Sequence, residues 1–116
     1  MFLRATLIAL ATLTATSVSA DFARVDDRDH FMKLVEGRDL TRLGIKLNVD
    51  SSHISGKAFG TSVKGAWQWN NGYFCRSLYF GSRNLGDNCQ EVKIDDATIR
   101  FTSDQGTGDF ADFTLR

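Results

Sequence analysis

Arg76 is the residue whose type and surroundings point most directly to ligand binding. It lies within WQWNNGYFCRSLYF, residues 67–80, which contain six aromatic side chains. A guanidinium in such a setting can stack on an aromatic face and hold an anion through its rigid fork of N–H donors. A salt bridge between Arg76 and an aspartate of the same sheet is the structural alternative. The predicted ligand-binding residues are Arg76, Tyr73, Tyr79, Trp67 and Trp69.

The two cysteines, Cys75 and Cys89, predict a disulfide. Their pairing would close a loop of about 15 residues, and the chain-entropy account gives such a bridge roughly 3 kcal/mol of stabilisation. A redox or metal site is the alternative. However, catalytic dithiols favour the spacing Cys-x-x-Cys, and no histidine lies near either cysteine in the sequence. We therefore expect a structural bridge and no metal site.

Residues able to support catalysis are sparse. Ser51, Ser52 and His53 are consecutive, but no glycine-flanked nucleophile elbow surrounds them. Residues 103–109, SDQGTGD, have the oxygen-rich composition of a calcium loop, yet they lack its twelve-residue pattern with a terminal glutamate and suit a hairpin turn better. The sequence predicts no catalytic residue and no cofactor.

A helix followed by a series of short strands must position these residues. Residues 26–37 place aspartates in the first turn and Phe31, Leu34 and Val35 at positions i, i+3 and i+4, which is typical of a short amphipathic helix. Apolar and polar residues then alternate, and Asp, Asn, Ser and Gly mark the turns. The predicted strands are residues 43–49, 53–59, 62–69, 73–80, 89–94, 98–102 and 110–115.

The short connections between these strands favour antiparallel neighbours, because a parallel pair needs a crossover of a dozen or more residues. We expect a mainly β or α+β fold, with one N-terminal helix on a curled or closed antiparallel sheet of six to seven strands, a calycin-like small barrel. Alternation in strand 62–69 places Trp67 and Trp69 on the inner face. Residues 81–88 are expected to form an exposed loop that Cys89 anchors.

The first 20 residues have the pattern of a cleaved secretory signal: Arg4, an apolar run, and Val18-Ser19-Ala20. A transmembrane anchor is the alternative, but the run is short and threonines interrupt it. Cleavage would leave residues 21–116 as one small domain in the periplasm or outside the cell. Without Arg4, 13 basic and 14 acidic side chains give a formal charge near −1, so neither nucleic acid nor a membrane is expected as a partner.

The segments GAWQWNNGYFCRSLYF, LGDNCQEV and IRFTSDQGTGDFADFTLR give the chain a family resemblance. It resembles a group of short exported alphaproteobacterial proteins of unassigned function, over most of residues 21–116. Members of this group often carry the automatic name dihydrodipicolinate reductase, which implies a dinucleotide-binding enzyme with a glycine-rich turn. This chain has no G-x-G-x-x-G and is too short for such a domain plus a substrate domain, so no catalytic residue is carried over.

The expected function is that of an exported soluble module that binds a small apolar or anionic ligand, because small barrels hold ligands in aromatic-lined mouths. The alternative is an inhibitor-like binder of another exported protein through residues 81–88, since the expected architecture is similar to that of secreted bacterial protease inhibitors. An enzyme is the least favoured of the three, because the sequence carries no metal cluster, nucleophile–base pair or cofactor fingerprint.

Overall fold

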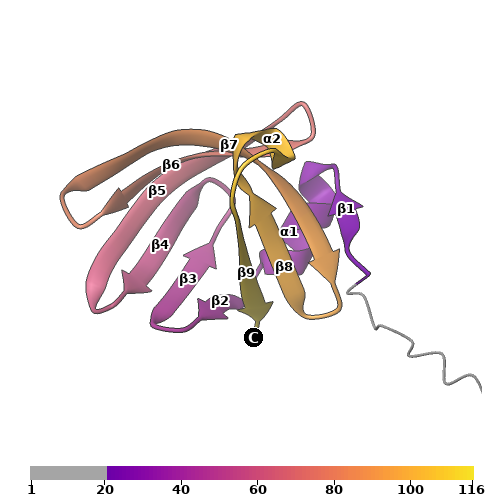
Figure 1. Ribbon diagram of the computed structural model, residues 1–116. Helices are drawn as coiled ribbons and strands as arrows, with labels where there is room; N and C mark the ends of the chain where they lie inside the picture. The colour runs from indigo at the N-terminus through magenta and orange to yellow at the C-terminus, as the bar shows by residue number, and fades with distance from the viewer. Residues whose placement is uncertain (1–20) are drawn as a thin grey trace, which may run out of the picture.

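The computed structural model describes residues 21–116 and shows one antiparallel sheet that closes on itself (Figure 1). The expected secretory signal, residues 1–20, lies outside the described residues. The strands are β1 (Ala23–Val25), β2 (Asp39–Arg42), β3 (Ile45–Val49), β4 (His53–Ala58), β5 (Thr61–Asn70), β6 (Tyr73–Phe80), β7 (Arg83–Asp95), β8 (Thr98–Thr102) and β9 (Phe110–Leu115). Two helical segments accompany them, α1 (Arg28–Val35) and α2 (Ser103–Gly106).

Strands β2 to β9 form an eight-stranded barrel in which each strand pairs with the next one along the chain. Pairing of Leu40 with Leu115 and of Thr41 with Thr114 joins β2 to β9 and closes the barrel. The long strand β7 pairs with β6 through its first half and with β1 through residues 92–94. Closure leaves few unpaired strand edges, which suits a chain without proline.

The structure has nine strands where the sequence predicts six to seven, because β1 and β2 were not expected. The first half of β7 was not expected either, so that strand is longer than predicted. Both β1 and β2 are short and carry charged residues, so their sequences look like loops. Residues 81–88 do not form the expected loop: only residues 81–82 separate β6 from β7, and Asn84, Asp87 and Asn88 pair with β6. Strands β6, β8 and β9 have the bounds that the sequence predicts.

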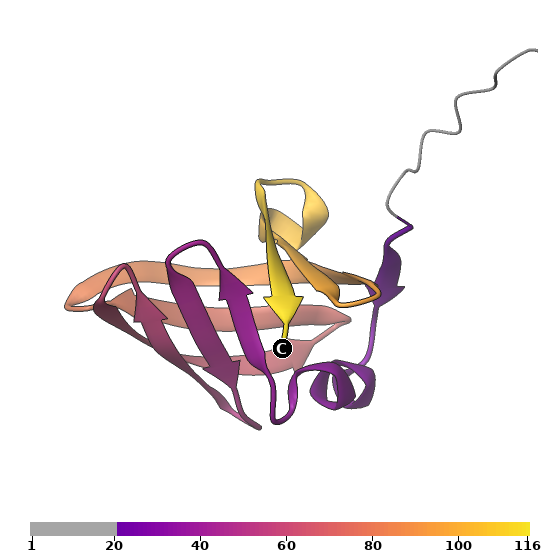
Figure 2. The same ribbon diagram turned by 90° about the horizontal axis from the view of Figure 1, so that it is seen from below.

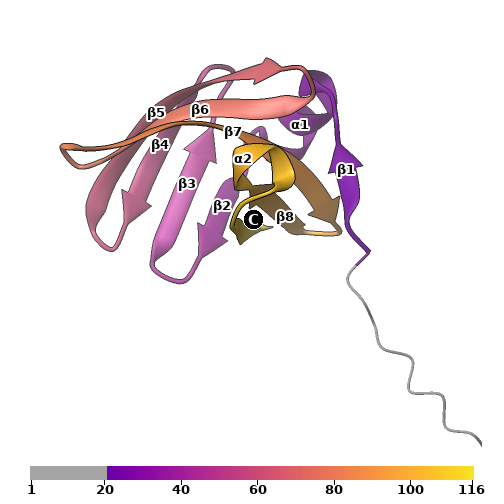
Figure 3. The ribbon, with the colours of Figure 1, turned by 45° about the horizontal axis from the view of Figure 1, so that its top comes forward.

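Helix α1 lies across one end of the barrel, opposite the end that carries the β6–β7 turn (Figures 2 and 3). It is shorter than the predicted segment because Asp27 is its N-cap, accepting a hydrogen bond from the backbone N–H of His30 at 2.8 Å. Phe31 and Val35 point inward and are buried. The helix therefore closes the end of a barrel, whereas the sequence suggested a helix lying on a sheet.

An aromatic cluster joins α1 to the strands. Phe31 has no exposed surface, and its ring centroid lies 5.0–5.3 Å from those of Trp67, Trp69 and Phe74 and 6.3 Å from that of Phe101. Trp67 is 4% exposed, so its predicted inward orientation is confirmed. Such packing stabilises the fold because it buries apolar surface and because the rings adopt the edge-to-face and stacked geometries that aromatic pairs favour.

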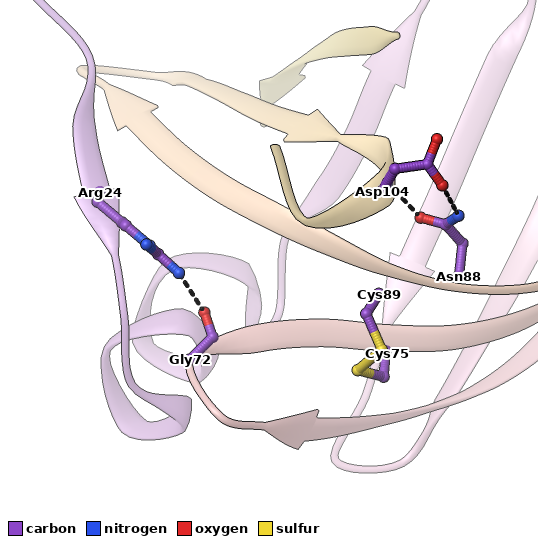
Figure 4. Close-up of a disulfide and its surroundings, with 6 residues drawn as sticks. All are labelled: Arg24, Gly72, Cys75, Asn88, Cys89 and Asp104. Atoms are coloured by element: carbon purple, nitrogen blue, oxygen red, sulfur yellow. Dashed lines mark hydrogen bonds between the residues drawn. A yellow bond between two sulfur atoms is a disulfide. The ribbon is translucent and has the colours of Figure 1, made fainter. Parts of the chain in front are cut away.

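The predicted disulfide between Cys75 and Cys89 is confirmed (Figure 4). The two residues lie directly opposite each other on β6 and β7, with their Cα atoms 3.9 Å apart. Beside them, the Asn88 side chain exchanges two hydrogen bonds with Asp104 of α2, at 2.8 and 2.9 Å. One of these bonds goes to the Asp104 carboxylate and the other comes from the Asp104 backbone N–H, so the bridge and Asn88 fix the middle of β7 to β6 and to α2.

Asp50 holds the β3–β4 turn, which lies at the helix-covered end. Its carboxylate accepts hydrogen bonds from the backbone N–H groups of Ser52 and His53, at 2.9 and 2.6 Å, and these bonds lower the pKa of Asp50. The backbone carbonyl of Asp50 also accepts a hydrogen bond from Trp67 Nε1 at 2.9 Å. The turn thus connects a surface carboxylate to the core tryptophan.

We expect protonation of Asp50 in acid to lower the free energy of unfolding of the protein. A carboxyl whose pKa is lower in the folded state stabilises the fold above its unfolded pKa, about 3.9, and this contribution is lost as the pH falls through the folded value. Urea unfolding between neutral pH and about pH 3 should show a smaller loss of stability for Asp50→Asn than for the original protein. Equal losses in the two proteins would contradict the role given to Asp50.

Candidate functional site

A cavity of about 200 Å³ lies inside the barrel, between β6 and β7 on one side and β2, β3 and β9 on the other. Its lining is almost entirely apolar, with Leu47, Ile54, Leu78 and Phe113 among the residues that form it. These side chains come from alternate positions of their strands, which is why they share the inner face. The aromatic cluster around Phe31 bounds the cavity, since Phe74 and Phe101 belong to both.

Arg76 is the charged residue in the lining. Its Nη1 donates a hydrogen bond to the backbone carbonyl of Gly86 at 3.0 Å. Burial lowers the pKa of Arg76, and Asp87 opposes this effect. Within residues 21–116 no carboxylate forms an ion pair with Arg76, so the salt bridge considered from the sequence is not formed.

Gln90 is a polar residue of the cavity that was not among the predicted ligand-binding residues. Its Nε2 donates a hydrogen bond to Ser103 Oγ at 3.3 Å, and its side chain lines the same cavity as Arg76. In the structure Cys89 bonds to Cys75 on the outer face, so Gln90, the next residue of β7, faces inward. The cavity therefore offers a guanidinium and a carboxamide within an apolar surface.

The structure separates the five residues that the sequence grouped as a ligand site. Arg76 lines the cavity, whereas Trp67 and Trp69 pack beside it against Phe31 of the core. Arg76 and Trp67 do share the lining of a second, more open hollow. Tyr73 and Tyr79 alternate with the inward residues of β6 and lie on the outside. The Arg24 guanidinium lies 4.8 Å from the ring centroid of Tyr73, and Tyr79 is 44% exposed. Neither tyrosine lines the cavity.

The Ser52–His53 pair is the arrangement closest to a catalytic constellation. Ser52 Oγ lies 2.9 Å from His53 Nδ1, which is 3.9 Å from the Asp50 carboxylate. All three side chains are exposed at a turn on the outside of the barrel, away from the internal cavity. Within residues 21–116 there is also no group of three or more His, Cys, Asp or Glu side chains able to hold a metal ion. We assign no catalytic role to this turn.

The fold and its cavity define a small up-and-down β-barrel with an internal, mainly apolar pocket. Comparison with protein-family models, curated proteins and solved structures finds no match for the chain. Between residues 21 and 116, none of the helices has the length and apolar character required to cross a membrane. The disulfide is a bond that persists in oxidising compartments.

Proposed function

We propose that this protein is an exported binding module whose calycin-like barrel takes a small apolar ligand with an anionic group. The observation that carries the proposal is Arg76, a guanidinium placed among apolar side chains without a carboxylate partner in residues 21–116. Taking a charge out of water is costly unless an opposite charge or several hydrogen bonds compensate it. A ligand anion would supply that compensation.

Arg76 has N–H donors that could bind such a ligand. A guanidinium carries five N–H groups, and within residues 21–116 one hydrogen bond, to Gly86, engages that of Arg76. The remaining donors can form the paired hydrogen bonds that carboxylates favour. Gln90, on the neighbouring strand β7, adds a carboxamide to the same cavity. The polar groups thus suit a carboxylate or another small oxyanion.

The cavity size limits the apolar part of the ligand. An engineered apolar cavity of about 150 Å³ in another protein takes up benzene. The present cavity, about 200 Å³, therefore fits one aromatic ring or a short acyl chain. Benzoate and octanoate are suitable probes, and benzyl alcohol and octanol are their uncharged counterparts. We place this binding in the periplasm or outside the cell, in keeping with the leader-like N-terminus and the disulfide.

The test is calorimetric titration of the purified protein with these four probes. We expect the two carboxylates to bind more tightly than the two alcohols. Arg76→Met should weaken carboxylate binding by about 2–5 kcal/mol, which is roughly 30-fold or more, because the anion would enter an apolar site unpaired. The melting temperature should stay equal or rise, because the substitution removes a half-buried charge that forms no ion pair within residues 21–116.

Arg83→Met is the matched control, since it removes the same charge from an exposed position on β7. Its carboxylate affinity should equal that of the original protein. Equal binding of carboxylates and alcohols, or unchanged binding by Arg76→Met, would exclude Arg76 as the anion contact. If no probe binds and Arg76→Met unfolds the protein, Arg76 is structural, and the inhibitor-like alternative becomes the better account.

A further inference from the structure

Two apolar side chains stand out from the end of the barrel farthest from α1. Leu43, in the turn between β2 and β3, is 94% exposed, and Phe59, in the turn between β4 and β5, is 72% exposed. The turns touch, because the backbone N–H of Phe59 donates a hydrogen bond to the carbonyl of Gly44 at 2.7 Å. We call Leu43, Gly44, Phe59 and Gly60 the apolar tip.

Phe59 occupies a backbone conformation that bulky residues rarely adopt. Its φ is +50°, and the φ of Gly60 is +79°. A two-residue hairpin turn with both φ angles positive favours Asn followed by Gly, because asparagine tolerates the left-handed region. A phenylalanine here adds backbone strain and leaves a large ring in solvent. The ring packs over Gly44 of the neighbouring turn, yet most of Phe59 remains exposed to solvent.

The half of the barrel that carries the tip is rich in basic residues, although the net charge of the chain is near zero. Residues 40–86 contain six Lys or Arg residues and one acidic residue, Asp50, whereas the other described residues contain seven basic and thirteen acidic ones. Lys46 and Lys57 lie opposite each other on β3 and β4, just behind the tip. Lys46 contacts Asp39 at 3.4 Å, whereas Lys57 has no ion pair within residues 21–116.

We propose that the apolar tip docks on the surface of a lipid bilayer with anionic headgroups. This revises the expectation, drawn from the net charge, that no membrane is a partner. Projecting apolar side chains bordered by lysines and arginines bind such surfaces by combining shallow insertion with electrostatic attraction. A protein partner would need a matching hollow for each side chain. A bilayer accepts them without shape complementarity, and the near-complete exposure of Leu43 favours the bilayer.

The test is sedimentation of the purified protein with vesicles, after its mass has shown whether residues 1–20 were removed. One set of vesicles contains phosphatidylglycerol and phosphatidylethanolamine in equal amounts, and the other contains phosphatidylcholine alone. At low salt we expect binding to the anionic vesicles and little binding to the neutral ones. The double variant Leu43→Ser/Phe59→Asn should reduce the affinity about tenfold or more, and Lys57→Glu should also weaken it.

Phe59→Asn separates lost binding from unfolding. Relief of the strained φ should offset the loss of the ring's contact with Gly44, so the melting temperature should change little while vesicle binding falls. Phe110→Ser, which removes another exposed phenylalanine between Asp109 and Asp112, is the control and should bind as the original protein does. Three outcomes would overturn the proposal: no binding to the anionic vesicles, equal binding to both vesicle types, or equal binding by the double variant. Self-association through the tip without vesicle binding would indicate a protein interface.

Discussion

Replacing Phe31 with alanine should lower the free energy of unfolding by about 3–5 kcal/mol, the range for a large buried aromatic residue. Phe31 has no exposed surface and touches the rings of Trp67, Trp69, Phe74 and Phe101. Domains of this size are usually stable by about 5–15 kcal/mol, so the variant should be close to unfolding. Urea titration followed by tryptophan fluorescence measures the change, since both tryptophans contact Phe31.

Lys33→Ala is the control on the same helix, because Lys33 is exposed and alanine preserves helix propensity. Its effect should stay within about 0.5 kcal/mol. A loss below about 1 kcal/mol for Phe31→Ala would mean that the helix contributes little to the barrel. The same loss in both variants would point to helix formation, rather than core packing, as the source of the effect.

The sequence predicted the parts of the fold that depend on local pattern. Phe31 and Val35 share the inner face of α1 because they are four residues apart, and both are buried. Asn71 and Gly72, both with positive φ, form the turn before β6, which begins at Tyr73 as predicted, while β5 ends at Asn70, one residue later than predicted. These features rest on neighbours within a few positions of each other, so a single sequence carries them.

The parts that were missed depend on partners far away in the chain. Strand β2 has four residues, DLTR, and is held by β3 and by β9, whose residues lie more than 70 positions later. Its charged sequence has no strand pattern of its own. The number of strands in the closed barrel likewise depends on the pairing of β2 with β9, and no local sequence pattern predicts that pairing.

The candidate site was only partly predictable for a related reason. In β6 both faces carry large or apolar side chains, so alternation alone could not say whether Arg76 or the tyrosines faced inward. In the structure Cys75 and Cys89 pair on the outer face, and Arg76, the next residue of β6, points into the barrel. The cavity itself exists only once the barrel has closed around it.

Removal of the disulfide is the second change with a large expected effect. The double variant Cys75→Ser/Cys89→Ser should lose about 3 kcal/mol of stability, the chain-entropy value for a loop of about 15 residues. Carboxylate binding should weaken as well. The bridge holds β6 to β7 beside Arg76, and the contact between Arg76 and Gly86 spans the same two strands. A looser strand pair would place the guanidinium less accurately.

Urea unfolding with and without a thiol reductant separates this effect from that of the serines themselves. Reductant should lower the midpoint of the original protein to that of the double variant and should leave the double variant unchanged. If reductant changes neither protein, the ladder of hydrogen bonds between β6 and β7 suffices to hold these strands. In that case the positioning of Arg76 would depend on the barrel alone, and the bridge would contribute little stability, whether through the folded or the unfolded chain.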